Sequence, residues 1–381
     1  MRGYFIEYGC MLRILHASDL HLTSGPDREY GLEVLRELVC LANSRQADFL
    51  LLCGDLFDSF KDLKENSLLN SVRQEVQLLR AGCRALYIPG NHEDIGRGPK
   101  DRLSSFDLGR LELMTDAAAA CGGKTLETPE AEFICVPHSS DYSGYRKWQL
   151  PPKAPGRARL LLMHGTSSAV YRGPDQEEQQ AGVIPDSLFA WLEADYAALG
   201  HVHSARETLI GGTLAVYCGS ARVWRKWEDG PRKAVFFETE GGKIGARQDL
   251  FIKAAGEYRY FTLPVNPDSS ILPTAMRELL EKCPAPYRDY IVVRFSGLVE
   301  DANALAGLKS VVEGVLRAKN PRRLELLSDQ VEIFGGLADN ALAKQFLEKL
   351  DSRRPAEDSP EMPRWVAARQ QGLAALAGDL E

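Results

Sequence analysis

The stretch Ala47-Asp-Phe-Leu-Leu-Leu-Cys-Gly-Asp-Leu-Phe-Asp58 joins an apolar run directly to a polar motif. Residues 47–53 have the length and the apolar character of a buried strand. Gly54 permits a sharp turn at the end of this strand, because glycine adopts backbone angles that other residues avoid. Asp55 follows the turn, so we expect the carboxyl end of the strand to carry a functional carboxylate.

Four more polar motifs stand at the ends of predicted strands, which we expect at residues 12–17, 84–88, 159–163 and 196–199. The motifs after them are Asp19-Leu20-His21, Gly90-Asn91-His92-Glu93, His164-Gly165 and Gly200-His201-Val202-His203. Five of the seven histidines lie in these motifs, whereas His16 and His138 stand outside them. We interpret His16 and His138 as structural or supporting residues.

Helices are predicted between the first strands, because apolar residues recur with a helical period in residues 30–45 and 64–81. Alternating strands and helices favour an α/β layered fold. Active sites of open α/β sheets lie along the carboxyl edge of the strands. Side chains from distant motifs are therefore expected to meet in one pocket.

The motifs contain the ligands of a site for two metal ions. They supply two carboxylates, one amide and four imidazoles, from Asp19, His21, Asp55, Asn91, His164, His201 and His203. A mixed nitrogen and oxygen shell suits Mn²⁺, Fe²⁺, Zn²⁺ or Mg²⁺. Asp55 is the best candidate to bridge two cations, because a carboxylate offers two oxygens and a full negative charge. Sites of this kind hydrolyse phosphate esters.

Each motif taken alone also fits a structural interpretation. Asp19-Leu20-His21 fits a surface turn, Gly54-Asp55 fits a turn into a helix with an aspartate cap, and His164 fits a buried core histidine. Only the combination, with every motif at a strand end, indicates a metal site.

Composition excludes several classes of protein. The chain has 381 residues, with 44% apolar and 26% charged, which is ordinary for a globular protein of about two domains. No apolar run approaches the ~18 residues that a membrane-spanning helix needs. The first ten residues read as an extension before Met11, without the pattern of a secretion signal. The eight cysteines form no Cys-x-x-Cys pair, which favours free thiols in the cytoplasm.

The pattern of elements changes after about residue 253. Strands are predicted at 257–264, 289–295 and 323–334, with helices at 269–282 and 301–318. We therefore predict a first domain at 1–253, a small α+β domain at 254–335 and a C-terminal helical segment at 336–381.

The order and wording of the five motifs resemble the calcineurin-like metallophosphoesterase superfamily over residues 11–220. The resemblance implies a layered β-sandwich flanked by helices. It implies that His92 is the catalytic acid and that Glu93 is not a ligand, although the superfamily often has aspartate there. One metal would be held by Asp19, His21, Asp55 and His203, and the other by Asp55, Asn91, His164 and His201.

A narrower resemblance is to the SbcD-type DNA double-strand-break repair nucleases. It is carried by the segments HASDLHL, GDLFD, GNHEDIGRGP and GHVH, followed by a small α+β unit. The resemblance implies a Mn²⁺-dependent exonuclease or endonuclease that hydrolyses phosphodiester bonds at DNA ends. It also implies a second domain that caps the site and grips DNA, a homodimer, and an SbcC-type coiled-coil ATPase as partner.

Local basic segments are the candidates for DNA contact, because the net charge of −7 gives no general attraction to nucleic acid. Cations alternate with aromatic rings after the last histidine motif, and a basic loop follows His92. The candidate DNA-binding residues are Arg97, Lys100, Arg102, Arg222, Arg225 and Lys226. A second basic and aromatic group lies at 145–148. The alternative is that these stems pack over a domain edge.

Four apolar segments are candidates for protein contacts. The helix at 64–81 and the segment at 100–114 are expected to pair across a two-fold axis, unless both are buried within one protomer. The helix at 338–350 and the segment from Trp365 are expected to dock on the ATPase, separated by a mobile linker at 352–363. The alternative is that both helices fold back on the second domain.

Two rival functions stay open at this point. One is a phosphodiesterase for small or cyclic nucleotides, which would use the same seven ligands. The other is a non-catalytic scaffold that binds DNA ends, whose natural signature would be lost ligands. No ligand is missing from the five motifs, and a small substrate needs no second domain.

Overall fold

The computed structural model describes residues 11–93, 106–116, 123–139, 141–169, 182–266, 270–283, 288–299, 301–333, 341–356 and 359–378. The chain divides into two compact units, Met1–Gly256 and Glu257–Glu381. Among the described residues, no helix is both long enough and apolar enough to span a bilayer.

The first unit contains a seven-stranded sheet in the order β14-β13-β1-β2-β3-β4, with β15 paired to β13. Its strands are β1 (Leu12–Ala17), β2 (Phe49–Cys53), β3 (Arg84–Ile88), β4 (Leu111–Leu113), β13 (Lys233–Glu240), β14 (Lys243–Ile244) and β15 (Gln248–Phe251). Strands β1 to β4 are parallel, whereas β13 runs antiparallel to β1. The first three motifs therefore follow parallel strands and emerge at one edge of this sheet.

A second sheet has the order β11-β12-β10-β7-β6-β5. Its strands are β5 (Thr125–Glu127), β6 (Ala131–Val136), β7 (Ala158–His164), β10 (Tyr196–Gly200), β11 (Arg206–Ile210) and β12 (Thr213–Tyr217). Strand β10 is parallel to both β7 and β12, so the last two motifs emerge at one edge of this second sheet. A short pair, β8 (Thr166–Ser167) and β9 (Val183–Ile184), lies beyond β7.

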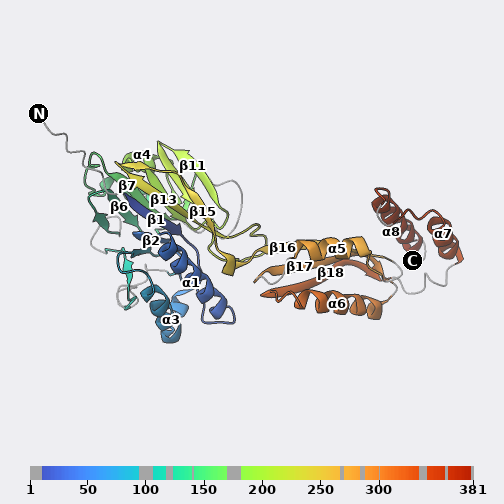
Figure 1. Cartoon of the computed structure of the whole chain (residues 1–381). Coiled ribbons are helices and arrows are strands. Elements are labelled where there is room, and N and C mark those ends of the chain that lie inside the picture. The colour runs from blue at the N-terminus through green and yellow to red at the C-terminus, as the bar shows by residue number, and fades with distance from the viewer. Residues whose placement is uncertain are drawn as a thin grey trace, which may run out of the picture. The chain divides into compact units, whose positions relative to one another are not determined.

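The two sheets pack face to face and form a β-sandwich (Figure 1). Their shared core contains Ile14 and Leu51 from the first sheet and Phe133 and Leu162 from the second. Helices α1 (Arg28–Ser44) and α3 (Asn66–Gln77) cover the outer face of the first sheet, with the short α2 (Phe60–Leu63) before α3. Helix α4 (Asp186–Leu192) covers the outer face of the second sheet. The layered α/β fold predicted from the sequence is confirmed.

The second unit is built on a parallel three-stranded sheet, β16-β17-β18. Its elements are β16 (Tyr258–Val265), α5 (Pro273–Lys282), β17 (Tyr290–Val299), α6 (Ala302–Arg317) and β18 (Arg323–Ile333). A 3-10 turn (Lys253–Ala255) precedes them at the end of the first unit. Phe295 and Val312 lie in one apolar core between the sheet and its helices. The parallel pairing follows from the helical connection between each pair of strands.

The C-terminal helices α7 (Ala341–Asp351) and α8 (Met362–Gly378) differ from the expected tethered pair. The indole Nε1 of Trp365 donates a hydrogen bond to the Leu350 carbonyl oxygen at 2.9 Å, which joins the two helices. Trp365 also clusters with Leu272, and Leu373 with Leu298. These apolar side chains are therefore used within the second unit, which favours the alternative that the helices fold back on it.

The apolar face expected to form a dimer is buried within one chain. Leu68, Val72 and Val76 of α3 lie in the core between helices and sheet, together with Leu108 and Leu111. A sequence pattern shows that a face is apolar but not which surface covers it. The apolar side chains of α3 are therefore unavailable for the contact proposed for them, and Leu103 lies outside the described residues.

Removing buried volume between the two sheets should destabilise the first unit. Leu162 is fully buried in the shared core, whereas Leu209 on β11 is 71% exposed. We expect Leu162→Ala to lower the free energy of unfolding by about 2–5 kcal/mol. The matched Leu209→Ala should stay within about 0.5 kcal/mol of the wild type. Urea unfolding followed by circular dichroism measures both, and equal stabilities would contradict this packing.

Candidate metal centre

The five motifs meet where the carboxyl edges of the two sheets adjoin. In the first sheet, Asp19 follows β1, Asp55 follows β2 and Asn91 follows β3. In the second sheet, His164 is the last residue of β7 and His201 follows β10. The edges are joined by hydrogen bonds between the sheets. The His201 amide donates to Asp19 Oδ1 at 3.0 Å, and His164 Nδ1 donates to the Cys53 carbonyl oxygen at 2.9 Å. Residues far apart in the sequence therefore share one site.

The backbone of the motifs is strained. Asp19, His21, Asp55 and His201 have φ angles of 55°, 46°, 49° and 90°. Side-chain-bearing residues seldom adopt this left-handed region, and such outliers cluster at functional sites. In this conformation the side chains of the four residues lie at the shared edge.

Glycines allow the two edges to approach closely. A Cβ atom on Gly54 would lie 2.0 Å from His164 Nδ1, and one on Gly90 would lie 2.1 Å from Asp55 Oδ1. A Cβ atom on Gly200 would lie 1.8 Å from the Cys53 carbonyl oxygen. Each distance is far below contact, so any side chain at these positions would push the candidate ligands apart.

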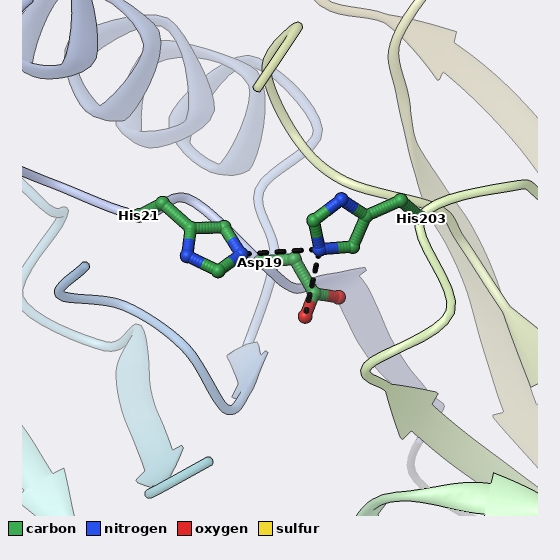
Figure 2. Close-up of side chains that lie close together, drawn as sticks. All are labelled: Asp19, His21 and His203. Atoms are coloured by element: carbon green, nitrogen blue, oxygen red, sulfur yellow. Dashed lines mark hydrogen bonds and ion pairs between the residues drawn. The ribbon is translucent and has the colours of Figure 1, made fainter. Parts of the chain in front are cut away.

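The first group of candidate ligands consists of Asp19, His21 and His203 (Figure 2). The two Nε2 atoms of His21 and His203 lie 3.1 Å apart, and His203 Nε2 lies 4.0 Å from Asp19 Oδ1. His203 Nδ1 donates to Glu228 Oε1 at 2.5 Å. This bond leaves the Nε2 lone pair of a neutral His203 directed at the site, as in a carboxylate–histidine–metal arrangement.

The second group consists of Asp55, Asn91, His164 and His201. Asn91 Oδ1 lies 2.9 Å from His164 Nε2 and 3.0 Å from His201 Nδ1. Asp55 Oδ2 lies 3.3 Å from His164 Nε2 and 3.8 Å from His21 Nε2. The Asp55 carboxylate therefore stands between the two groups. The structure brings together all seven side chains that the sequence singled out as ligands.

The donor set fits divalent metal ions. The Nδ1–H of His164 is used by the Cys53 carbonyl, so the Nε2 lone pair of a neutral His164 faces the oxygens of Asn91 and Asp55. Such facing lone pairs repel unless a proton or a cation lies between them. Among the described residues, His201 Nε2 is buried and has no hydrogen-bond partner. A shell of imidazole, amide and carboxylate donors suits first-row divalent ions.

The electrostatics of the site also favour positive charge. Burial opposes ionisation of Asp55, but His164 and His21 hold its pKa well below the usual range. Burial likewise opposes the charged imidazole of His164, yet the Asp55 carboxylate raises its pKa to about 9. Both shifts come from the mutual attraction of the buried Asp55 carboxylate and the imidazole rings beside it.

Three supporting residues were missed from the sequence. Buried Glu93 accepts backbone hydrogen bonds from Gly90 (2.6 Å), Phe57 (2.8 Å) and Asp55 (3.2 Å), and so joins two motif loops. Burial, reinforced by Asp55, raises the pKa of Glu93 to about 7. Glu228 orients His203, and the Asp58 carbonyl oxygen accepts from His92 Nδ1 at 2.6 Å. The only sequence signal for these residues was their position inside or near a motif.

Arg222 was wrongly assigned to DNA contact. Its side chain is fully buried, donates to the His21 carbonyl oxygen, and lies 4.7 Å from the ring centroid of Trp224. A guanidinium without exposed surface cannot reach a phosphate, so Arg222 supports the His21 loop. The alternation of cations and rings in the sequence did not reveal which of them point inward.

The other candidate DNA residues differ in position. Arg225 is partly exposed and Lys226 is exposed. Arg97, Lys100 and Arg102 lie outside the described residues.

The two histidines outside the motifs have different surroundings. His16 is buried and forms a hydrogen bond with the Tyr196 hydroxyl at 3.1 Å, and burial lowers its pKa to about 3. His138 Nδ1 lies 3.3 Å from the His164 carbonyl oxygen, where it supports the site.

Comparison with known proteins assigns the class. The calcineurin-like phosphoesterase family matches residues 12–205. The chain therefore belongs to this family, and it is a metal-dependent phosphoesterase.

Curated relatives add a narrower similarity. The chain is 25% identical over 224 residues to the DNA double-strand break repair protein Mre11 of Thermoplasma acidophilum, covering 55% of this chain and 56% of that protein. It is 26% identical over 281 residues to the SbcD component of the nuclease SbcCD of Escherichia coli K12, covering 63% and 68%. It is 31% identical over 94 residues to a probable cyclic nucleotide phosphodiesterase of Coxiella burnetii, covering 24% and 35%. The chain spans little more than half of the Mre11 relative.

The position of Asp55 between the two groups leads to a test by metal analysis. We expect Asp55→Asn to bind at least one metal ion fewer than the wild type, because a neutral amide cannot serve as the shared anion of two cations. The matched control is Asp249→Asn, whose carboxylate pairs with Lys233 at the surface. Elemental analysis of both proteins after dialysis against Mn²⁺ measures the number of metal ions bound per chain. An unchanged number in Asp55→Asn would refute the role of Asp55 as the shared ligand.

The close approach at Gly54 gives a second test. We expect Gly54→Ala to bind metal at least tenfold more weakly, because its φ of 88° is strained for alanine and the new Cβ would displace His164. Gly307→Ala is the matched control, since Gly307 lies in α6 with nothing within 4 Å of its Cβ position. That control should keep metal affinity and gain about 0.5–1 kcal/mol of stability. Calorimetric titration with Mn²⁺ measures the metal affinity of both variants, and an unchanged affinity in Gly54→Ala would contradict this expectation.

Proposed function

We propose that this chain is a metal-dependent nuclease that hydrolyses phosphodiester bonds at DNA ends. The observation that carries the proposal is the convergence of seven candidate ligands from five strand ends on one site. The names of the Mre11 and SbcCD relatives supply the substrate class. Mn²⁺ is the expected metal, with Mg²⁺, Fe²⁺ or Zn²⁺ as alternatives. We further propose a cytoplasmic homodimer that works with an SbcC-type coiled-coil ATPase.

Bound metal ions would polarise a phosphodiester and lower the pKa of a bound water. The residues of the chain provide the frame. One ion would be held by Asp19, His21 and His203. The other ion would be held by Asn91, His164 and His201, and Asp55 would bind both ions. Glu93 and Glu228 keep their loops in place through their hydrogen bonds to Gly90 and His203.

His92 is the candidate for moving a proton. Its Nδ1 must carry hydrogen, because its partner at 2.6 Å is the Asp58 carbonyl oxygen, which only accepts. The Nε2 atom of a doubly protonated His92 can therefore give its proton to the leaving oxygen. The Asp58 carboxylate lies 3.6 Å from the same Nδ1 atom. His92 also lies near His21 and Asp55, so a ligand role is the alternative.

The rival phosphodiesterase function has support from the Coxiella burnetii relative, but over 94 residues only. The second unit, residues 257–381, argues for a larger substrate, since a small nucleotide needs no further domain. The rival scaffold function has no support in the site, where none of the seven ligands is replaced. A gel assay on duplex DNA with Mn²⁺, run beside a small chromogenic phosphodiester, distinguishes the three functions.

The role of His92 is tested by comparison with a ligand. We expect His92→Asn to keep its metal content and to lose turnover by about 10²–10⁴-fold. His203→Asn should instead lose metal, because His203 belongs to the first group of ligands. If His92→Asn is also depleted of metal by elemental analysis, His92 is a ligand and not the acid.

The role of the second unit is tested by truncation after Gly256, the end of the first unit. We expect the truncated protein to hydrolyse the small diester within about threefold of the full chain and to lose most cleavage of duplex DNA. All seven ligands and His92 precede the cut. Thermal melting checks that the truncated protein is folded. Unchanged DNA cleavage would show that the second unit does not position the duplex.

A further inference from the structure

The loop that follows Arg222 is anchored to two candidate metal ligands. The indole of Trp224 lies parallel to the imidazole of His21, with ring centroids 5.0 Å apart and an angle of 4°. Glu228 binds His203 Nδ1 through Oε1 and accepts from the Trp224 amide at 2.7 Å through Oε2. The short segment 225–227 between these anchors is therefore held beside the metal centre.

The far side of the loop is held by a buried arginine. Arg232 is 6% exposed, and its guanidinium donates to the carbonyl oxygens of Glu228 (2.9 Å), Asp229 (2.5 Å) and Gly230 (3.0 Å). These bonds fix the backbone directly after residue 227. The position of Trp227 is thus set by the same groups that set His21 and His203.

Trp227 is exposed to solvent in an unfavourable backbone conformation. Its side chain is 61% exposed, and its φ angle is 72°. A bulky aromatic residue is disfavoured both in the left-handed region and in water. The rigid anchors on either side hold it in this conformation. Strain of this kind, next to a metal centre, is typical of a binding residue.

The chemistry around Trp227 suits an unpaired nucleobase. An indole offers a flat apolar face, and the preceding Arg225 and Lys226 offer positive charge for phosphates. Aromatic rings interleaved with cations bind single-stranded nucleic acid in this way. Bases inside a duplex are stacked on both faces, and the terminal pair exposes one face only. An unpaired base at a single-stranded or frayed end therefore offers Trp227 the most accessible face.

We propose that Trp227 is a specificity-determining residue that stacks on an unpaired base of the strand being cleaved. The preferred substrate is then a single strand or a frayed DNA end, and not a fully paired one. This inference rests on the proposed nuclease function. It adds a residue and a substrate form to that function.

The test compares Trp227→Ala and Trp227→Phe with the wild-type protein. We expect Trp227→Ala to lose about 5- to 150-fold in kcat/KM on a single-stranded oligonucleotide, the worth of stacking one base. Trp227→Phe should recover most of this loss, because phenylalanine also stacks. Hydrolysis of a small chromogenic diester should stay within twofold in both variants. Leu209→Ala, at a 71% exposed apolar residue on β11, is the control and should change neither activity.

An abasic site locates the contact. A series of oligonucleotides carries one abasic nucleotide at successive positions. At one position, the kcat/KM of the wild type should fall by the same factor as the kcat/KM of Trp227→Ala falls on intact DNA. At that position the variant should lose nothing further, because the two changes remove one interaction. Quenching of a 2-aminopurine base at the same position, measured in EDTA, should occur with the wild type and be absent with Trp227→Ala.

The opposing outcomes are distinct. Equal losses on the oligonucleotide and on the small diester would make Trp227 a structural residue of the loop. Unchanged DNA cleavage, with or without an altered oligomeric mass, would overturn the stacking role while leaving the nuclease function intact. Failure of the wild type to cleave any DNA with Mn²⁺, while it hydrolyses the diester, would overturn the proposed function itself.

Discussion

The contact between the two sheet edges at Cys53 is the constraint on which the site depends. The Cys53 carbonyl oxygen accepts from His164 Nδ1 at 2.9 Å, and Gly200 passes so close that its Cβ would lie 1.8 Å from the same oxygen. This approach of β2 to β7 and β10 is what brings carboxylates of the first sheet within reach of imidazoles of the second. The hydrogen bond also directs the other nitrogen of His164 into the site. A wider sandwich would keep every strand and lose the metal centre.

A second consequence is that hydrogen bonds within the protein orient the candidate ligands. Asp19 accepts from the His201 amide, Asp55 accepts from the His92 amide at 3.0 Å, and Glu228 holds His203. Ligands that are already oriented lose little conformational freedom when they coordinate an ion. The cost lies instead in the strained backbone of the motif loops and in repulsion between facing lone pairs. Packing of the sandwich offsets both costs, and a cation would relieve the repulsion between the lone pairs.

The loop at 224–232 links this centre to the surface. The same Glu228 that orients His203 also accepts from the Trp224 amide, and the same Trp224 that stacks on His21 precedes the exposed Trp227. Geometry at the metal ligands and geometry at the surface tryptophan are therefore set by shared contacts. Substrate positioning and metal binding are expected to respond together when these shared contacts are broken, and separately when only Trp227 is changed.

The sequence by itself determined the strands, the order of the motifs and the types of the ligands. These features are local, because a buried strand such as Phe49–Cys53 and the turn at Gly54 depend on residues that are adjacent in the sequence. Only the tertiary structure decided what covers each surface. It placed Arg222 under His21, paired Glu228 with His203, joined two loops through Glu93 and buried the apolar face of α3. Periodicity shows that a side chain is apolar or charged, but its partner comes from a segment distant in the chain. That is why the seven candidate ligands could be singled out from the sequence and their supporting residues could not.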